Sequence, residues 1–469
     1  MRGLAHPTAL DWIDAHSALL HETSQSIWKN PEPSLKEYKA AALLADLLEE
    51  RGFDVQRGVA DMPTAFVASF TRGRGPVVAF LGEYDALPEL SQAAEPVRKP
   101  IVPGGYGHGC GHNLLGTGAL AAALAVKEAL ARGKAQGTVR FYGCPAEELL
   151  VGKVFMVRAG LFADCDLALT WHPGSVNQIS SSSNLAMNSA RFNFYGVSAH
   201  AAVSPELGRS ALDAVELMNV GVNFLREHVS SHARIHYVIT DGGSQPNVVP
   251  SYSQVWYYVR APRRAEVEEI YRRVLEIAQG AALMAGVTHK VEFVAGCYDT
   301  LRLESLLELT QANLEKVGGP TFSPEEKEFA RRLAQTHPPG SRERALERLG
   351  LDLPPDEPLH EGVLPDRKVR GISSGSTDVG DVSWNVPTAE LTTACWPVGN
   401  AAHSWQNTAA AGTTIGTKGM LVAAKVMALT ALDCMTDPDL LARIKAEHRE
   451  RTARSPYVSP LPADVKPQA

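Results

Sequence analysis

Two histidines and a cysteine lie close together in the stretch Gly107-His108-Gly109-Cys110-Gly111-His112-Asn113. Transition metals prefer thiolate and imidazole ligands, and a glycine between two ligands lets both side chains converge from one tight turn. The small, apolar residues 114–131 predict a buried helix, so the cluster would lie where a loop enters a helix and backbone amides favour a thiolate. The pattern predicts a metal site. The alternative is a glycine-rich turn with solvated histidines and a buried thiol.

Metal-competent residues also follow each of four predicted strands. One strand, within 76–88, leads to Glu83 and Asp85, and a second, within 138–144, leads to Glu147 and Glu148. A third, within 166–171, leads to His172, and a fourth, within 389–396, leads to His403. Runs that are apolar on both faces predict central strands of a parallel sheet, which places functional residues at the carboxyl ends of its strands. Together with the glycine-rich turn, these positions predict one metal centre at one edge of an α/β sheet.

Size and composition narrow the class of protein. A chain of 469 residues predicts two domains. A net charge of -7, a pI near 6.1 and no run of Lys or Arg argue against nucleic acid or an anionic membrane as a partner. The amino-terminal stretch lacks the apolar core of a secretory signal, and the six cysteines are sparse. We therefore expect a cytoplasmic protein that acts on a small molecule, with no membrane association.

The order of predicted elements indicates one domain inserted in another. Residues 8–30 and 34–51 predict two helices, and residues 186–297 predict strand, helix, strand, strand, helix and strand. That order suits a compact ferredoxin-like α/β sandwich. We therefore expect a catalytic domain of residues 1–185 and 298–469, with a mixed, largely parallel sheet flanked by helices. Residues 323–359 predict surface helices, and residues 371–381 predict a polar turn that either meets a ligand or is a plain loop.

The motifs together resemble the metal-dependent aminoacylase and carboxypeptidase superfamily in its amidohydrolase branch, and within it the B-subunit type of p-aminobenzoyl-glutamate hydrolase. They cover nearly the whole chain and include GEYDALPE, GHGCGHN, CPAEE, TWHPG, SAHAA, QPNVVP, STDVGDVSW and AAHSW. The resemblance implies a metallo-exopeptidase-like catalytic domain, an inserted lid and dimerisation domain, and hydrolysis of an N-acyl or N-aroyl amino acid. It also implies a homodimer formed through the inserted domain, or a heteromer with a second kind of subunit.

Residue by residue, the resemblance implies a site for one or two divalent metals. Its ligands would be Cys110, His112, Glu148, His172 and His403, with Glu147 as general base and Asp85 beside the ligands. His200 of the insertion would polarise the scissile carbonyl, in many members from the partner subunit, while Asn247 and Arg260 would contact the substrate. The thiolate and imidazoles favour Zn²⁺, whereas carboxylate-rich binuclear sites also take Mn²⁺. His108 and Glu83 lie outside this predicted ligand set.

Two departures from that pattern affect the predicted substrate. Leu149-Leu150-Val151 follows the paired glutamates where relatives of this type have glycines, and Asn113 stands where related amidohydrolases often carry Asp. Bulky apolar groups beside the base predict a more apolar pocket. Another N-acyl amino acid or aryl amide is therefore an alternative to p-aminobenzoyl-glutamate. A metal-binding partner subunit without turnover of its own is a second hypothesis.

Overall fold

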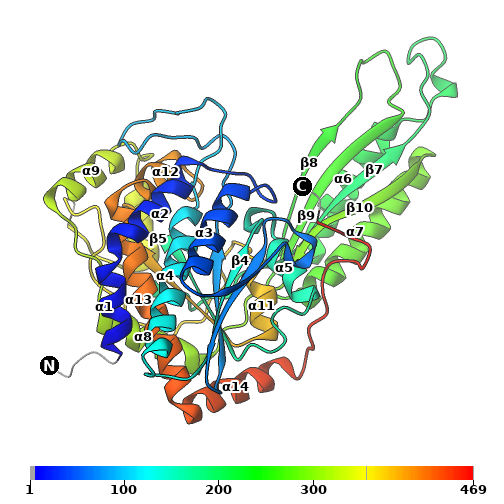
Figure 1. The fold of residues 1–469 in the computed structure, drawn as a ribbon. Coiled ribbons are helices and arrows are strands. Elements are labelled where there is room, and N and C mark those ends of the chain that lie inside the picture. Colours follow the sequence, from blue (N-terminus) through cyan, green and yellow to red (C-terminus); the bar gives the residue numbers. More distant parts are fainter. Residues whose placement is uncertain (1–5, 355, 468–469) are drawn as a thin grey trace.

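The computed structural model describes residues 6–354 and 356–467. A seven-stranded sheet lies at the centre of the larger part of the molecule (Figure 1). Its order is β1-β2-β4-β3-β5-β11-β6. The strands are β1 (Asp54–Arg57), β2 (Phe66–Arg72), β3 (Val77–Glu83), β4 (Gly137–Cys144), β5 (Leu167–Gly174), β6 (Gln178–Ile179) and β11 (Thr388–Ala394). The central strands β4, β3, β5 and β11 are parallel, and the outer ones pair antiparallel. The expected mixed, largely parallel sheet is confirmed.

Helices cover both faces of this sheet, which explains the uninterrupted apolar runs of its central strands. Val78 and Phe80 of β3 pack into one buried cluster with the helices of one face, while Ala79 and Leu81 pack into a second cluster on the other face. The helices of the first face are α1 (Pro7–Ala15), α2 (Ser17–Lys29), α3 (Tyr38–Glu50), α4 (His112–Ala131), α8 (Glu304–Val317), α13 (Thr414–Thr436) and α14 (Pro438–Thr452). The second face carries α5 (Gly152–Arg158) and α11 (Val379–Asn385). Successive side chains of a strand point to opposite faces, so both faces must be apolar.

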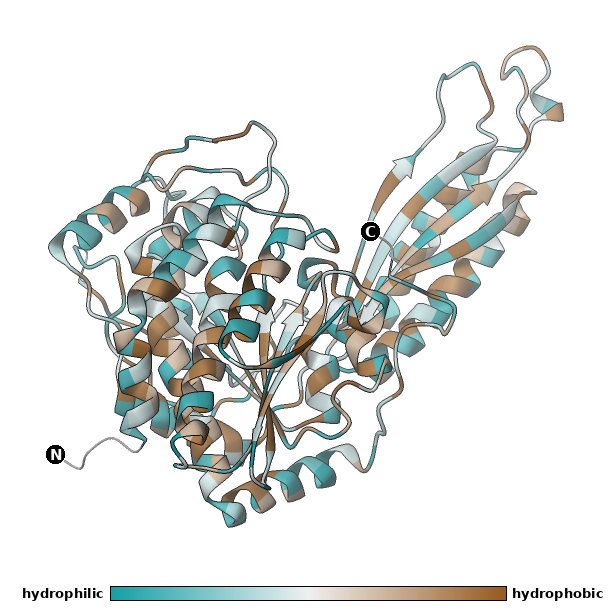
Figure 2. Ribbon diagram, in the orientation of Figure 1, coloured by the Kyte–Doolittle hydropathy of each residue, from teal (hydrophilic) through white to brown (hydrophobic). Residues whose placement is uncertain are grey.

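The helices α4 and α13 form the centre of the first face. Both are long and apolar enough to cross a membrane, but 83% and 72% of their most apolar windows lie buried inside the protein. Figure 2 shows their hydrophobic residues among the surrounding helices. Their hydropathy is accounted for by packing on the sheet and on each other.

A smaller unit, residues 186–297, stands apart from the larger one (Figure 1), and we call it the lid. It contains the antiparallel sheet β10-β7-β9-β8, built from β7 (Ala186–Tyr195), β8 (Arg234–Asp241), β9 (Tyr252–Ala261) and β10 (Thr288–Cys297). The helices α6 (Ala211–Leu225) and α7 (Arg264–Ala285) pack on one face, with a core of their own. The expected order of elements is confirmed, and so is the fold class, a mixed, largely parallel sheet flanked by helices with a smaller inserted α/β unit.

Some helices begin or divide at residues other than those expected from the sequence. The helix predicted over 8–30 is two helices that meet at His16, and the helix predicted from Ser34 begins only at Tyr38. Leu35 has a left-handed backbone, φ 64°, which is incompatible with a helix there. The segment 323–359 contains α9 (Pro324–Ala334) and α10 (Ser341–Leu349) as expected, whereas α11 begins inside the polar turn 371–381 and was not predicted.

Candidate metal centre

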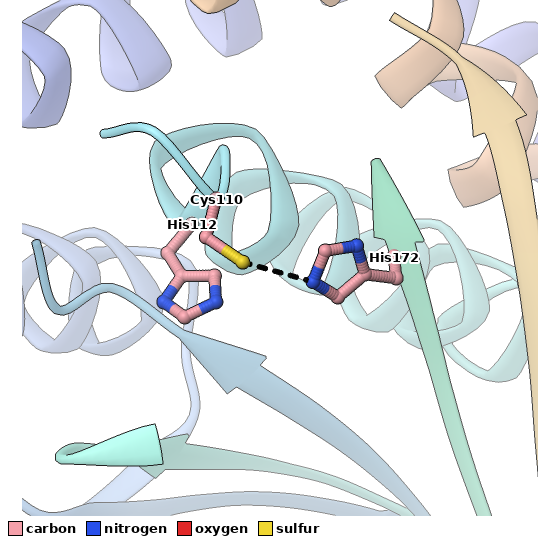
Figure 3. A group of neighbouring side chains, drawn as sticks. All are labelled: Cys110, His112 and His172. Carbon is pink, nitrogen blue, oxygen red and sulfur yellow. Dashed lines mark hydrogen bonds between the residues drawn. The ribbon is translucent and has the colours of Figure 1, made fainter. Parts of the chain in front are cut away.

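Five side chains with metal-binding atoms converge at the carboxyl ends of the central strands. Cys110 Sγ lies 3.3 Å from His172 Nε2 (Figure 3). Glu148 Oε2 lies 3.6 Å from His403 Nε2, and Glu148 Oε1 lies 4.0 Å from His112 Nε2. The ligand atoms of Cys110, His112 and His172 lie within 4.8 Å of one another, as do those of Cys110, Glu148 and His403. Cys110 is common to both groups.

The donor set fits one or two divalent cations. His112 Nε2 and Glu148 Oε1 are buried, and neither has a hydrogen-bond partner in the described part of the chain. Burying polar atoms without partners is unfavourable, and a cation between them would satisfy both. One thiol, three imidazoles and a carboxylate are a combination that Zn²⁺ and neighbouring transition metals bind.

Glycines bring Cys110 and His112 to this point. Gly111, with φ 77°, precedes the first residue of α4, and a Cβ there would lie 3.0 Å from the ring of Pro173. At Gly107 a Cβ would lie 1.9 Å from the carbonyl oxygen of Leu90, so the loop can approach only as glycine. The residue types of the motif thus follow from close packing as well as from ligand chemistry.

Asp85 orients His112. One carboxylate oxygen accepts a hydrogen bond from His112 Nδ1 at 2.8 Å, which leaves Nε2 directed toward the other donors. The other oxygen accepts from Ser34 Oγ at 2.8 Å and from the backbone N–H of Glu148 at 2.9 Å. Burial alone would raise the pKa of Asp85, but the hydrogen bonds and charge of His112 outweigh burial and lower it. Such carboxylate–histidine pairs fix the tautomer and direction of a metal-ligating imidazole.

The paired glutamates occupy a strained turn. Residues Glu147–Leu149 form one 3₁₀ turn, and the residues on either side, Ala146 and Leu150, both have left-handed backbones with φ 58°. Glu147 is buried, with Oε2 3.9 Å from His112 Nε2. Burial, and then repulsion from Glu83, raise the pKa of Glu147 well above its usual value, although Lys153 opposes the shift. A carboxylate with a raised pKa can accept a proton near neutral pH.

A buried lysine lies directly behind the site. Lys153 is fully buried, and its Nζ lies 2.7 Å from Glu83 Oε1 and 2.5 Å from Asp378 Oδ1. Glu83 Oε2 in turn lies 3.3 Å from His112 Nε2, and Glu83 forms a third group of potential ligands with His112 and Glu147. Lys153 and Asp378 were not predicted from the sequence, because nothing in the spacing of residues 83, 153 and 378 links them. His108, left out of the predicted ligands, is buried against the carbonyl of Ile27 at 3.2 Å.

The lid residues are not brought to the cluster. His200 and Asn247 are exposed and lie beside each other, since Ala201 N–H donates to the Asn247 carbonyl at 2.9 Å. Within the described residues their hydrogen bonds are local to the lid; His200 Nδ1 accepts from the amides of Ala202 and Val203 at 3.2 Å. Arg260 is half-buried on β9 and donates to Ser376 Oγ at 3.4 Å, in the turn before Asp378.

The fold and the donor set define a metal-dependent hydrolase. The chain belongs to peptidase family M20/M25/M40, whose sequence model matches residues 79–337. It is 43% identical to the B-subunit of p-aminobenzoyl-glutamate hydrolase from Escherichia coli (strain K12), over 97% of each chain. It is also 31% identical to Xaa-Arg dipeptidase of Mus musculus, over 94% of this chain and 91% of that one. A Bacillus subtilis structure described as a dinuclear metal binding peptidase from the M20 family matches with a TM-score of 0.59 at 17% identity, over 90% and 99% of the two chains. The resemblance inferred from the motifs is confirmed.

Proposed function

We propose that this protein hydrolyses the amide bond of an N-acyl or N-aroyl amino acid resembling p-aminobenzoyl-glutamate. The name of the Escherichia coli relative supports this substrate class. The observation that carries the reaction is the position of Glu147, which is buried with Oε2 3.9 Å from His112 Nε2. Glu147 lies outside the two donor groups that contain Cys110 and belongs only to the third group, with Glu83 and His112. Hydrolysis needs a base that is close to the metal ligands and is not itself engaged by the metal.

Each residue of the cluster then has a role. Cys110, His112, Glu148, His172 and His403 would hold one or two cations, Zn²⁺ or Mn²⁺ by the chemistry of the donors. A bound divalent metal supplies Lewis-acid chemistry and acidifies water at the site. The Glu147 carboxylate takes the proton from the attacking water and delivers it to the amine nitrogen that leaves when the amide C–N bond breaks. Asp85 keeps the Nδ1 proton of His112 in place throughout.

The lid would complete the site from outside. We assign residues 1–185 and 298–469 to the catalytic unit and residues 186–297 to a lid that also forms the dimer. In that arrangement His200 of one protomer opposes the negative charge that develops on the carbonyl oxygen in the other protomer, and Asn247 and Arg260 hold the substrate, Arg260 at its carboxylate.

Exposed apolar groups on the lid support a dimer. The edge strand β8 exposes Tyr237, Val238 and Ile239, and α6 exposes Val220 and Phe224, the last with 68% of its surface accessible. An unpaired strand edge with apolar side chains favours association with a second sheet. The name of the Escherichia coli relative describes one subunit of a hydrolase, so a heteromer with another kind of subunit is the alternative. The six free cysteines of the described chain agree with a reducing, cytoplasmic environment.

The deciding experiment combines metal analysis with a substrate panel. Protein purified without added metal is analysed for Zn and Mn, then assayed with p-aminobenzoyl-glutamate, N-benzoyl and N-acetyl amino acids, and dipeptides that end in Arg. We expect bound metal, release of free glutamate, and loss of activity on chelation that Zn²⁺ or Mn²⁺ restores. Metal without turnover of any substrate would favour the partner-subunit function, and faster cleavage of the dipeptides would replace the proposed substrate class.

A further inference from the structure

A short segment before α3 reaches the back of the candidate metal centre. In this segment, residues 33–37, Pro33 forms a β-bridge with Ala86, and Ser34 Oγ donates to Asp85 Oδ2 at 2.8 Å. At its end lies Glu37, a carboxylate that is fully buried and that the proposed reaction does not use. Residues 33–37 therefore contact the candidate metal centre through Asp85 and the adjacent Ala86.

Glu37 connects three segments that are distant in sequence. Its Oε1 accepts hydrogen bonds from the backbone N–H groups of Leu35 and Ala146, both at 2.9 Å. Its Oε2 accepts from Thr64 Oγ1 at 2.8 Å. The bond to Ala146 spans 109 residues and ends on the residue directly before Glu147.

The amides on both sides of Glu147 are thus held by buried carboxylates. Glu37 accepts from Ala146 N–H, and Asp85 accepts from Glu148 N–H at 2.9 Å. Ala146 has φ 58°, a conformation that costs an alanine roughly 1–2 kcal/mol. Such strain persists only where surrounding contacts hold it, and a fixed backbone on either side fixes where the Glu147 carboxylate can reach.

Glu37 is an unfavourable choice for stability alone. Among the residues that the structure describes, no Lys, Arg or His forms an ion pair with Glu37, and the charge that acts on it is that of Asp85. Burial, and then the charge of Asp85, raise the pKa of Glu37 to about 7. Burying a carboxylate without a counter-ion is costly, and its three hydrogen bonds offset only part of that cost. Its hydrogen bond to Ala146 offers a functional reason for its presence.

We propose that Glu37 is a positioning residue for Glu147, which holds the strained Ala146 amide and so keeps the catalytic carboxylate in register with the metal ligands. The inference rests on the proposed role of Glu147 as general base. It assigns no contact between Glu37 and the substrate. If Glu37 acts in this way, the reaction rate depends on whether the side chain at position 37 accepts a hydrogen bond from Ala146 N–H. It does not depend on whether that side chain is charged.

Two substitutions separate acceptor geometry from charge. Glu37→Leu removes all three hydrogen bonds, whereas Glu37→Gln keeps an oxygen for Ala146 N–H and loses the charge. Because a displacement of about 1 Å can cost roughly 100-fold in rate, we expect Glu37→Leu to lower kcat by about 100-fold, with KM within about threefold and metal content unchanged. We expect Glu37→Gln to retain kcat within about fivefold. Metal content is read by elemental analysis of the same samples.

Hydrogen exchange provides a measurement that does not depend on turnover. In Glu37→Leu, the peptide that covers residues 144–151 should exchange faster, while peptides from the lid exchange as in the wild type. The control is Asn313→Leu, which removes a buried amide that donates to Asp433 Oδ2 at 2.9 Å between α8 and α13. It should lower thermal stability without changing kcat or exchange at residues 144–151.

The outcomes separate this inference from the proposed function. If Glu37→Leu binds metal, turns over within threefold of the wild type and leaves exchange at residues 144–151 unchanged, Glu37 is not a positioning residue. If the wild type cleaves nothing in the substrate panel, the proposed function fails, and the exchange result alone decides whether Glu37 holds the turn. Equal losses in Glu37→Leu and Glu37→Gln would point to charge and overturn the proposal.

Discussion

The edge of the catalytic sheet and the tip of the lid differ in how far they are prepared for chemistry. At the sheet edge, neighbouring groups fix His112 and the turn that carries Glu147: Asp85 orients His112, and buried carboxylates hold the amides on both sides of Glu147. At the lid, His200 and Asn247 are exposed and their hydrogen bonds in the described chain stay within the lid. A prebuilt site favours metal binding, because donors that must first be ordered consume part of the binding free energy. Substrate contacts can form later, on closure or from a second protomer.

The largest effect on kcat should come from a substitution at the edge of the large sheet, where the candidate groups are already held in place. Glu147→Gln removes the proposed proton acceptor, which lies outside the two donor groups that contain Cys110. We expect kcat to fall roughly 10³- to 10⁴-fold, with metal content and thermal stability close to those of the wild type. Steady-state kinetics and elemental analysis provide the measurements. A variant with near wild-type kcat would remove Glu147 from the mechanism and with it the basis of the comparison.

A smaller but more specific effect is expected from the lid histidine. His200→Ala should lower kcat by about 10²- to 10³-fold and leave metal binding intact, because in the proposed mechanism His200 opposes the charge on the carbonyl oxygen. Mixing His200→Ala with Glu147→Gln protomers tests whether His200 acts across the dimer. Mixed dimers would contain one site with both residues, so activity should reappear well above that of either variant. Failure of the mixture to recover activity would place His200 in its own protomer's site or outside the reaction.

A third substitution tests substrate binding by the lid. Arg260→Gln should raise KM by roughly 10- to 100-fold with little change in kcat, the cost of losing one charge-assisted hydrogen bond to a carboxylate. Arg191→Gln is the matched control, since Arg191 lies on the same face and pairs with Glu292 at 3.1 Å. An equal rise of KM in both variants would indicate a general electrostatic effect rather than a contact at Arg260.

The smallest effect concerns the connection between the two regions. Asp381 in α11 accepts from the backbone N–H of Tyr298, the residue after β10, at 3.0 Å and from Tyr457 at 2.9 Å. Burial raises the pKa of Asp381 to about 7, opposed by these hydrogen bonds. Its contribution to stability is therefore fully present below the unfolded value of 3.8 and is lost as the pH rises through about 7.

Replacing the carboxyl group of Asp381 should therefore make the free energy of unfolding depend less on pH. At pH 9 we expect Asp381→Asn to unfold at a higher urea concentration than the wild type, because its free energy of unfolding should be larger by up to about 4 kcal/mol from linkage. At pH 4 the two proteins should differ little in stability. Asp366→Asn provides a control of opposite sign, because hydrogen bonds from Arg370 lower the pKa of Asp366. It should weaken the fold at neutral pH. A parallel pH response in wild type and Asp381→Asn would show that Asp381 does not titrate in this range.

Much of the fold and most of the site could be predicted because the signals are local. Apolar runs such as 77–82 predicted central strands, and the residues just after them were expected at one sheet edge, where β4, β3, β5 and β11 do end in parallel. The glycines around Cys110 and His112 indicated a tight loop. The chemistry of the candidate ligands and the strands that carry them therefore lie in the sequence, since each depends on residue type and short spacing.

The tertiary structure alone decided which groups support those residues. Lys153 joins Glu83 and Asp378, and Glu37 reaches Ala146, through contacts between segments 70 to 225 residues apart. The same contacts set the backbone: Leu35 and Ala146 adopt left-handed conformations that their residue types disfavour, and α3 starts later than its helical pattern predicts. Buried polar groups take their partners from whatever the packed chain brings near. Local periodicity does not encode those long-range partners, so the sequence specified the candidate ligands and the packing specified how they are held.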